Sequence, residues 1–170
     1  ERRGVVRPLI LTDAVLARLG VAERVRAASG CAEAASVFDG IAENPTIAGV
    51  DSALLAYRAG ACDGIVAVGG GSVLDSGKAL RILARQGGRL IDYLLDPALI
   101  QRDLVALITI PTTAGTGAEV TFGGGIHPQA NAPALGLRSV HARPDVALCD
   151  PELTLTLPPR LTAATGMDAL

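Results

Sequence analysis

Short apolar runs alternate along the chain with longer stretches in which apolar residues recur at helical spacing. The first pattern is typical of buried strands and the second of amphipathic helices. Residues 120–142 fit neither pattern and are expected to form an irregular hairpin or a long loop. The alternation predicts an α/β fold with a mostly parallel sheet covered by helices on both faces. Strands are expected over residues 6–12, 35–40, 64–68, 104–110 and 144–150, and helices over residues 14–29, 47–59 and 73–85.

The composition supports a packed core made of aliphatic side chains. The 170-residue chain is 49% hydrophobic and 19% charged, which separates it from disordered chains. It has two Phe, two Tyr and no Trp, so aromatic residues contribute little. The net charge of −2 and the shortage of stacking aromatics argue against nucleic-acid binding.

No apolar run approaches the roughly 20 residues that a membrane-spanning helix needs, so no membrane partner is expected. The opening stretch ERRGVVRPLILTD is interpreted as the first strand rather than as a signal peptide. The three cysteines, Cys31, Cys62 and Cys149, lie far apart without a C-x-x-C pair. This usage fits reduced thiols in a cytoplasmic protein and gives no zinc-finger spacing.

Polar or glycine-rich residues follow four of the expected strands. Ligands of open parallel sheets bind at the carboxyl ends of the strands, so these four segments are expected to share one edge. The segments are Asp13, Asn44–Thr46, Gly69–Ser72 and Pro111–Gly117.

The glycine segment, within VAVGGGSVLDSGKAL (66–80), fails two common phosphate patterns. A Walker A loop would need Gly at Ser72 and Ser or Thr at Ala79, and the G-x-G-x-x-G fingerprint would need Gly at Leu74. Glycines at a helix N-terminus nevertheless expose backbone amides to an anion. Ser72 is expected at the helix N-cap, where it would bind a phosphate oxygen or cap the helix. The alternative is a tight strand-to-helix turn without a ligand.

A second segment, PTTAGTGAEVT (111–121), offers hydroxyls and backbone amides after a buried strand. It is expected either to hold a cofactor's ribose, pyrophosphate or adenine, or to form a polar loop without a ligand.

Three motifs in order, GGGSVLDSGKA, PTTAGTGAEVT and DPELTLTLPPRLTAATGMDAL, resemble the iron-containing (group III) alcohol dehydrogenases, within the dehydroquinate synthase-like superfamily. The resemblance runs from about Leu9 to the last residue. It implies a Rossmann-like dinucleotide-binding domain over residues 1–155 and the start of a helical metal-binding domain over residues 156–170, most of which this chain would lack. It also implies hydride transfer between NAD(P) and a small alcohol or aldehyde, and a homodimer in the full-length protein.

The resemblance assigns cofactor contacts residue by residue. It implies that Gly70, Gly71 and Ser72 hold the pyrophosphate, and that Asn44 borders the cleft. The adenine and ribose side would be lined by Thr112, Thr113, Thr116 and Leu153.

Asp13 stands where NAD-using members carry an aspartate for the ribose hydroxyls. A carboxylate there would repel a 2′-phosphate, which predicts NAD over NADP. The alternative role of Asp13 is a helix N-cap.

In the family, the last motif continues G-[MV]-D-A-L-x-H-A, and its Asp and His bind Fe²⁺ or Zn²⁺ from one helix face. Asp168 corresponds to this Asp, and the sequence ends two residues before the His. A lysine that members often carry near the nicotinamide aligns with Ala134. His127 and His141 fall at no ligand position and are expected to be ordinary loop residues. Two hypotheses remain open: a dehydrogenase of which this is a part, inactive by itself, or a non-catalytic nucleotide-binding module.

Overall fold

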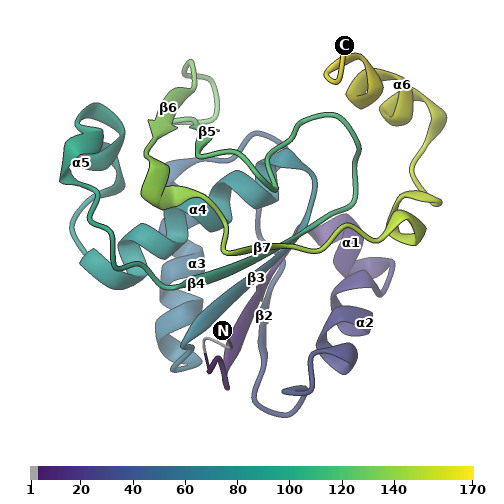
Figure 1. Ribbon diagram of the computed structural model, residues 1–170, viewed down its shortest axis with the longest axis horizontal. Coiled ribbons are helices and arrows are strands. Elements are labelled where there is room, and N and C mark those ends of the chain that lie inside the picture. Colours follow the sequence, from purple (N-terminus) through teal and green to yellow (C-terminus); the bar gives the residue numbers. More distant parts are fainter. Residues whose placement is uncertain (1–3) are drawn as a thin grey trace.

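The computed structural model describes residues 4–170 and contains a central sheet of five parallel strands (Figure 1). The spatial order is β2-β1-β3-β4-β7, so β3 and β4 lie next to each other and their carboxyl ends share one edge. The expected parallel α/β fold is therefore confirmed. The strands are β1 (Pro8–Leu11), β2 (Ser36–Phe38), β3 (Gly64–Gly69), β4 (Ala106–Pro111) and β7 (Val146–Ala147).

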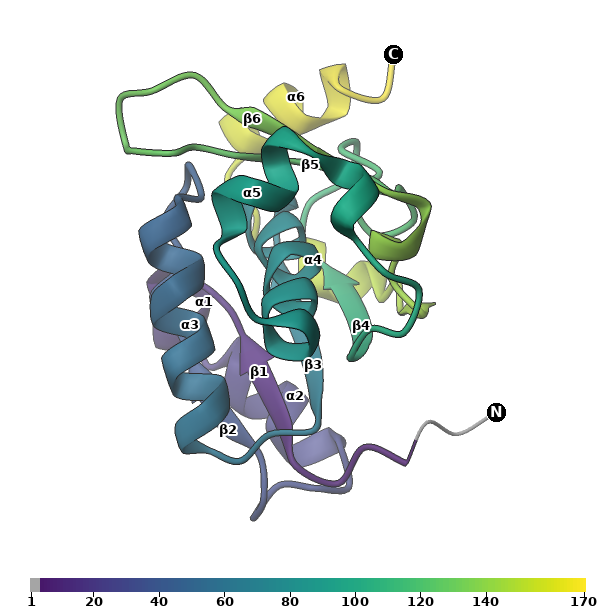
Figure 2. The ribbon, with the colours of Figure 1, turned by 90° about the vertical axis from the view of Figure 1, so that its left-hand side faces the viewer.

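Helices cover both faces of this sheet. One face carries α3 (Ile47–Ala59) and α4 (Gly71–Gln86), which stand in front of the strands in Figure 2. The other carries α1 (Ala14–Arg18) and α2 (Val21–Ala28). The expected helix over residues 47–59 is matched residue for residue.

Residues 120–142 contain a two-stranded antiparallel hairpin, β5 (Gly123–Ile126) and β6 (Leu135–Arg138). The hairpin alternative is thus confirmed. The remaining helical elements are α5 (Leu90–Leu95), η1 (Pro97–Leu99), η2 (Val140–Ala142), η3 (Pro151–Thr154) and α6 (Pro159–Met167).

Two expected elements differ from the structure. The single helix predicted over residues 14–29 is broken at Gly20, which adopts a left-handed φ of 75° between α1 and α2. Hydrophobic spacing continues through this break, which is why periodicity does not reveal it. The strand predicted over residues 144–150 is reduced to Val146–Ala147, although the amides of Asp145 and Leu148 also donate to β4 carbonyls.

The main core lies between the sheet and the α3/α4 face. Its fully buried side chains include Leu9, Ile65, Leu80 and Leu107. At its margin, burial raises the pKa of Tyr57 to about 12 and also raises the pKa of the Cys62 thiol. A smaller cluster around Ile10, Val66, Val68 and Ile110 packs against the α1/α2 face. Within residues 4–170, no helix has both the length and the apolar character needed to cross a membrane.

Candidate functional site

The glycine loop, Gly69–Ser72, joins β3 to the N-terminus of α4. Gly70 is the N-cap, and no side chain caps this helix. Amides in the first turn of a helix lack a carbonyl one turn earlier, so those of Gly71 and Ser72 remain for a ligand. The dipole of the 16-residue helix adds positive potential at this point. The expectation that Ser72 is the N-cap is wrong, because Ser72 is the second helical residue and its hydroxyl donates to the Glu43 carbonyl.

The threonine loop, Pro111–Gly117, follows β4 and lies directly against the glycine loop. Thr112 is 4% exposed, and its backbone amide donates to the Gly69 carbonyl at 3.0 Å. A Cβ placed on Gly70 would lie 3.5 Å from the Thr113 side chain, and one on Gly71 would lie 3.3 Å from Thr116. The glycine loop and the threonine loop, called here the loop pair, therefore lie in contact. Gly70 and Gly71 present only backbone atoms to the threonine side chains.

Asn44 lies exposed on a segment that is tied to the glycine loop by the hydrogen bond from Ser72 to Glu43. Two residues further along, Thr46 caps α3, since its Oγ1 accepts from the Gly49 amide at 3.1 Å. Asn44 thus follows directly after the residue that Ser72 contacts, close to the glycine loop.

Asp13 caps α1, which is the second of the two roles foreseen for it. Its Oδ1 accepts from the amides of Val15 and Leu16 at 2.8 and 3.0 Å. The residue is only partly buried, so capping leaves the carboxylate accessible at the carboxyl end of β1.

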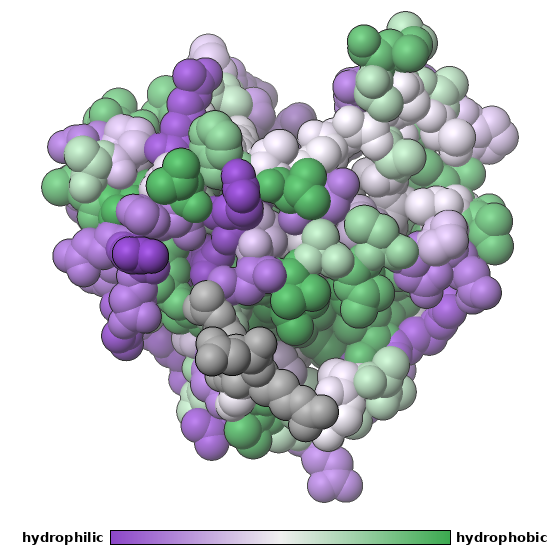
Figure 3. All heavy atoms as spheres, in the orientation of Figure 1, coloured by the Kyte–Doolittle hydropathy of each residue, from purple (hydrophilic) through white to green (hydrophobic). Residues whose placement is uncertain are grey.

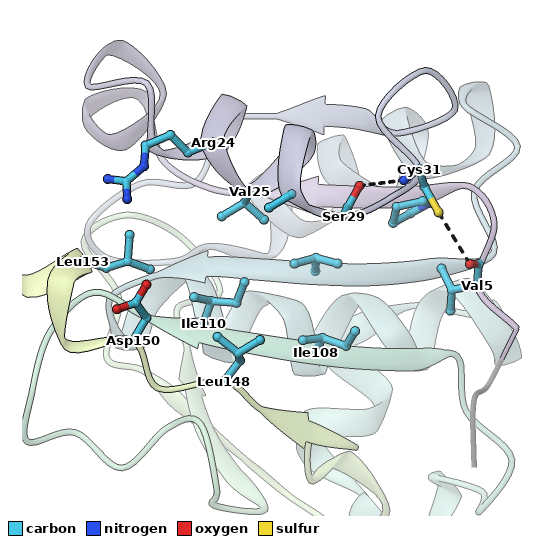
Figure 4. A pocket seen from close by; sticks show the side chains of 13 residues that line it. Val5, Arg24, Val25, Ser29, Cys31, Ile108, Ile110, Leu148, Asp150 and Leu153 are labelled. Carbon is cyan, nitrogen blue, oxygen red and sulfur yellow. Dashed lines mark hydrogen bonds between the residues drawn. The ribbon is translucent and has the colours of Figure 1, made fainter.

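Leu153 lies in η3 and packs on the smaller core cluster rather than in the loop pair. It lines one end of an apolar pocket of about 420 Å³ between α2 and the sheet (Figure 4). Figure 3 shows this hollow as a hydrophobic area on the face turned to the viewer. Arg24 and Asp150 flank Leu153, and Ile110, the residue before the threonine loop, lies beside them.

The C-terminal helix α6 approaches the threonine loop at Gly115. Gly115 has a φ of 114°, and a Cβ placed there would overlap the carbonyl oxygen of Thr165 and lie 3.4 Å from the Cβ of Asp168. The structure thus places Asp168 beside the loop pair. Glycine at position 115 is required both by its backbone conformation and by this close contact.

A model of the family described as iron-containing alcohol dehydrogenase matches residues 1–151. The chain belongs to this family. The resemblance based on the three motifs is therefore confirmed.

Curated relatives span the whole chain and are longer than it. A 4-hydroxybutyrate dehydrogenase of Cupriavidus necator is 47% identical over 173 residues, which cover 100% of this chain and 45% of the relative. A lactaldehyde reductase of Escherichia coli K12 is 35% identical over 172 residues, with the same coverage of 100% and 45%. The chain thus spans about half the length of these relatives.

A solved structure of the sulfoacetaldehyde reductase from Bifidobacterium kashiwanohense, in complex with NAD⁺, is similar throughout. It superposes with a TM-score of 0.89 at 33% identity and covers 97% of this chain and 44% of that one.

The described residues do not fit a complete iron site of the family. Asp168 is exposed at the C-cap of α6. No group of three or more His, Cys, Asp or Glu side chains suited to a metal occurs within residues 4–170. His127 has structural contacts instead. Its Nδ1 lies 2.6 Å from the Ala132 carbonyl oxygen, and its backbone forms hydrogen bonds with Pro45 and Ile47 at the start of α3. One carboxylate does not make a protein site for Fe²⁺ or Zn²⁺.

Sequence reasoning missed two buried cations on α4. Lys78 is fully buried and Arg81 is 2% exposed. The helical spacing of apolar residues does not predict that either cation is buried. One of their partners lies on the adjacent turn of α4, and the others lie 24 to 64 residues away in sequence. Ala134, at the position of the family's lysine, is exposed just before β6 and brings no charge to the site.

Proposed function

We propose that this chain is the cofactor-binding part of an NAD-dependent alcohol dehydrogenase. The contact of the glycine loop with the threonine loop, at the carboxyl ends of adjacent strands, carries the proposal. Family membership supports hydride transfer between the cofactor and a small alcohol or aldehyde. We place the nucleotide-binding domain at residues 1–155 and the beginning of a helical domain at residues 156–170.

The open backbone at the start of α4 supports a placement for the cofactor's anion. The amides of Gly71 and Ser72, at the start of α4, would bind the pyrophosphate, and Gly70 leaves room for it. Thr113 and Thr116 would offer hydroxyls to the ribose and adenine side, while Thr112, being buried, would fix the loop. Asn44 would border the cleft.

Leu153 would contact the adenine from the end of the apolar pocket. The second carboxylate oxygen of Asp13, which does not cap α1, would face the ribose hydroxyls, and the charge of the carboxylate would repel a 2′-phosphate. In this proposal, Asp13 and Leu153 would define the adenosine end of the site.

The metal would polarise the substrate oxygen in a complete enzyme. Among the described residues 4–170, the family resemblance assigns one ligand to the metal, Asp168, and a single carboxylate does not make a protein site for it. This observation favours a second candidate function for residues 1–170 taken alone, a nucleotide-binding module without turnover.

Two assays test these proposals. Titration of the chain with NADH, followed by nicotinamide fluorescence, is expected to saturate, and no binding at millimolar concentrations would overturn the cofactor proposal. Alcohol-dependent NADH formation with added Fe²⁺ or Zn²⁺ is expected to be absent. Turnover by the chain would show that its own residues complete the metal site.

A further inference from the structure

Helix α6 is exposed along its length except where it meets the threonine loop. Thr165 is the one residue of Pro159–Met167 that is partly buried, and its carbonyl oxygen lies against Gly115. The hydroxyls of Thr162 and Thr165 donate to carbonyls one turn earlier in the chain, so these bonds do not tie the helix to the sheet. The contact between Thr165 and Gly115, called here the α6 contact, therefore attaches this helix to the loop pair.

By itself, α6 is a weak helix. It has nine residues, its N-cap is Pro158 without a side-chain hydrogen bond, and Gly166 lies near its end. Helices shorter than about 12–15 residues are marginal in water, and glycine lowers helix propensity further. The helical state of α6 therefore depends on the α6 contact, and its local opening should cost little free energy.

The threonine loop contacts the glycine loop and α6 through neighbouring residues. Thr113 and Thr116 face the glycine loop, and Gly115 lies between them in the sequence. Because no more than two residues separate these contacts, a displacement of the loop at one of them moves the other. The loop thus connects the proposed cofactor site to α6.

Helix α6 stands apart from the sheet in Figure 1 and is joined to it through η3. In η3, Leu153 packs on the smaller core cluster, and the Asp150 side chain caps the turn by accepting from the Glu152 amide at 3.0 Å. The linker Leu155–Pro158 follows, and Leu155 is 80% exposed. A few such residues can absorb the change in backbone angles when a helix moves as a unit. Helix α6 can therefore dock on the threonine loop or leave it while η3 stays in place.

We propose that docking of α6 and binding of the cofactor are coupled through the threonine loop. When the pyrophosphate and adenosine half of the cofactor fills the loop pair, α6 docks more firmly, and when α6 is docked, the cofactor binds more tightly. The inference rests on the proposed function for its ligand. The nicotinamide half is not needed, because the loop pair is assigned to the pyrophosphate, ribose and adenine. Linkage requires the two effects to be equal in size.

Hydrogen exchange of the unmodified chain tests the coupling without any substitution. Exchange over residues 159–167 is measured alone, with saturating NADH, with saturating ADP-ribose, and with nicotinamide mononucleotide at the same concentration. NADH and ADP-ribose are each expected to slow this exchange about fivefold, at the lower end of typical couplings between sites. Nicotinamide mononucleotide is expected to leave it unchanged. Helix α5, which follows the C-terminal end of α4, is the internal control and should keep its exchange rate with every ligand.

A variant of α6 tests the reverse effect without altering the loop pair. Ala163→Gly/Ala164→Gly replaces two exposed alanines and weakens the helix by its propensity alone. The Kd for NADH should rise about fivefold, by the same factor as NADH slows exchange. Ala27→Gly/Ala28→Gly is the matched control, because it replaces two exposed alanines at the end of the short helix α2. Its Kd should stay within about twofold.

Unchanged exchange over residues 159–167 with saturating NADH would overturn the proposal, as would an unchanged Kd in the α6 variant. Protection by NADH but not by ADP-ribose would also overturn it, since the effect would then come from the nicotinamide half. If the unmodified chain binds neither NADH nor ADP-ribose, the proposed function fails and the coupling fails with it. If NADH binds and only the exchange or the variant gives the contrary result, the proposed function stands and the coupling alone is refuted.

Discussion

The α3/α4 face of the sheet and the carboxyl edge of the same sheet are built in opposite ways. On the covered face, large aliphatic side chains such as Leu80 and Leu107 are fully buried in one cluster. At the edge, Gly70, Gly71 and Gly115 keep side chains out, so that loops and a helix N-terminus approach each other by their backbones. The fold depends on filled space and the site depends on space left open. Substitutions in the two regions should therefore affect different quantities.

Leu80→Ala should give the largest effect, a loss of unfolding free energy of about 2–5 kcal/mol, because Leu80 is fully buried in the main core. Urea denaturation measures it. The folded fraction should retain its NADH affinity. Leu55→Ala on α3 is the control, since Leu55 is 67% exposed and its removal should cost less than about 0.5 kcal/mol. Equal losses at the two positions would remove the basis for the comparison.

Gly71→Val should lower NADH affinity and leave stability largely unchanged, the opposite of Leu80→Ala. Its side chain would press on Thr116 and fill the space over the first α4 amides, so NADH affinity should fall at least about 30-fold, or about 2 kcal/mol. Calorimetric titration measures the affinity. Gly166→Val in α6 is the matched control, because a Cβ there meets nothing within 4 Å. NADH binding by Gly71→Val at the unmodified level would contradict the assignment of the glycine loop.

Gly115→Ala should release α6 from the threonine loop, because the new Cβ would overlap the Thr165 carbonyl. None of the α6 residues is buried, so little else holds this helix. We expect faster hydrogen exchange over residues 159–167. Gly117→Ala separates strain from overlap, since Gly117 also has a positive φ of 62° but a Cβ there would meet only Thr121, at 3.8 Å. The same exchange in both variants would show that the contact with α6 is unimportant.

Asp13→Asn should reduce the preference for NADH over NADPH by about tenfold, or about 1.4 kcal/mol. The amide side chain can still accept the two α1 bonds and removes only the charge. Paired titrations with both cofactors measure the ratio. Asp13→Gly, which also removes the cap, should shift the ratio by the same amount while lowering stability. Equal affinities in the unmodified chain would refute the role of the charge.

Tyr57 gives the smallest effect, confined to the core and to alkaline pH. Its folded pKa of about 12 lies above the ordinary value of 10.0, so the unfolded chain ionises first. Stability conferred by this shift is complete below pH 10 and is lost as the pH rises toward 12. About 1 kcal/mol should disappear between pH 9 and pH 11. In urea denaturation at each pH, Tyr57→Phe should show a smaller loss of stability, with the remainder caused by the raised pKa of Cys62. An equal loss in the variant would show that Tyr57 is not its source.

The sequence predicts the sheet and the two loops because their signals are local. Apolar runs identify β3 and β4, and both loops follow directly after them. The N-cap was misplaced by two residues because three consecutive glycines precede Ser72 and nothing local shows where the helix begins.

Other features depend on distant residues and have no local signal. The break at Gly20 depends on a backbone conformation that leaves the hydrophobic spacing intact. The burial of Lys78 depends on Thr121 and Gly123, which lie 43 and 45 residues further along the chain. The need for Gly115 depends on α6. Such contacts follow from the tertiary structure and not from the pattern around each residue.

The central claim is that the open carboxyl edge, and not another surface, binds the cofactor. Amide-resolved NMR of the chain during titration with NADH tests it most directly. We predict saturating shifts at Gly70–Ser72 and Thr112–Thr116, and none at the amino ends of the strands. Shifts confined to the far end of the apolar pocket, around Val5 and Cys31, or no shifts at millimolar NADH, would contradict the account.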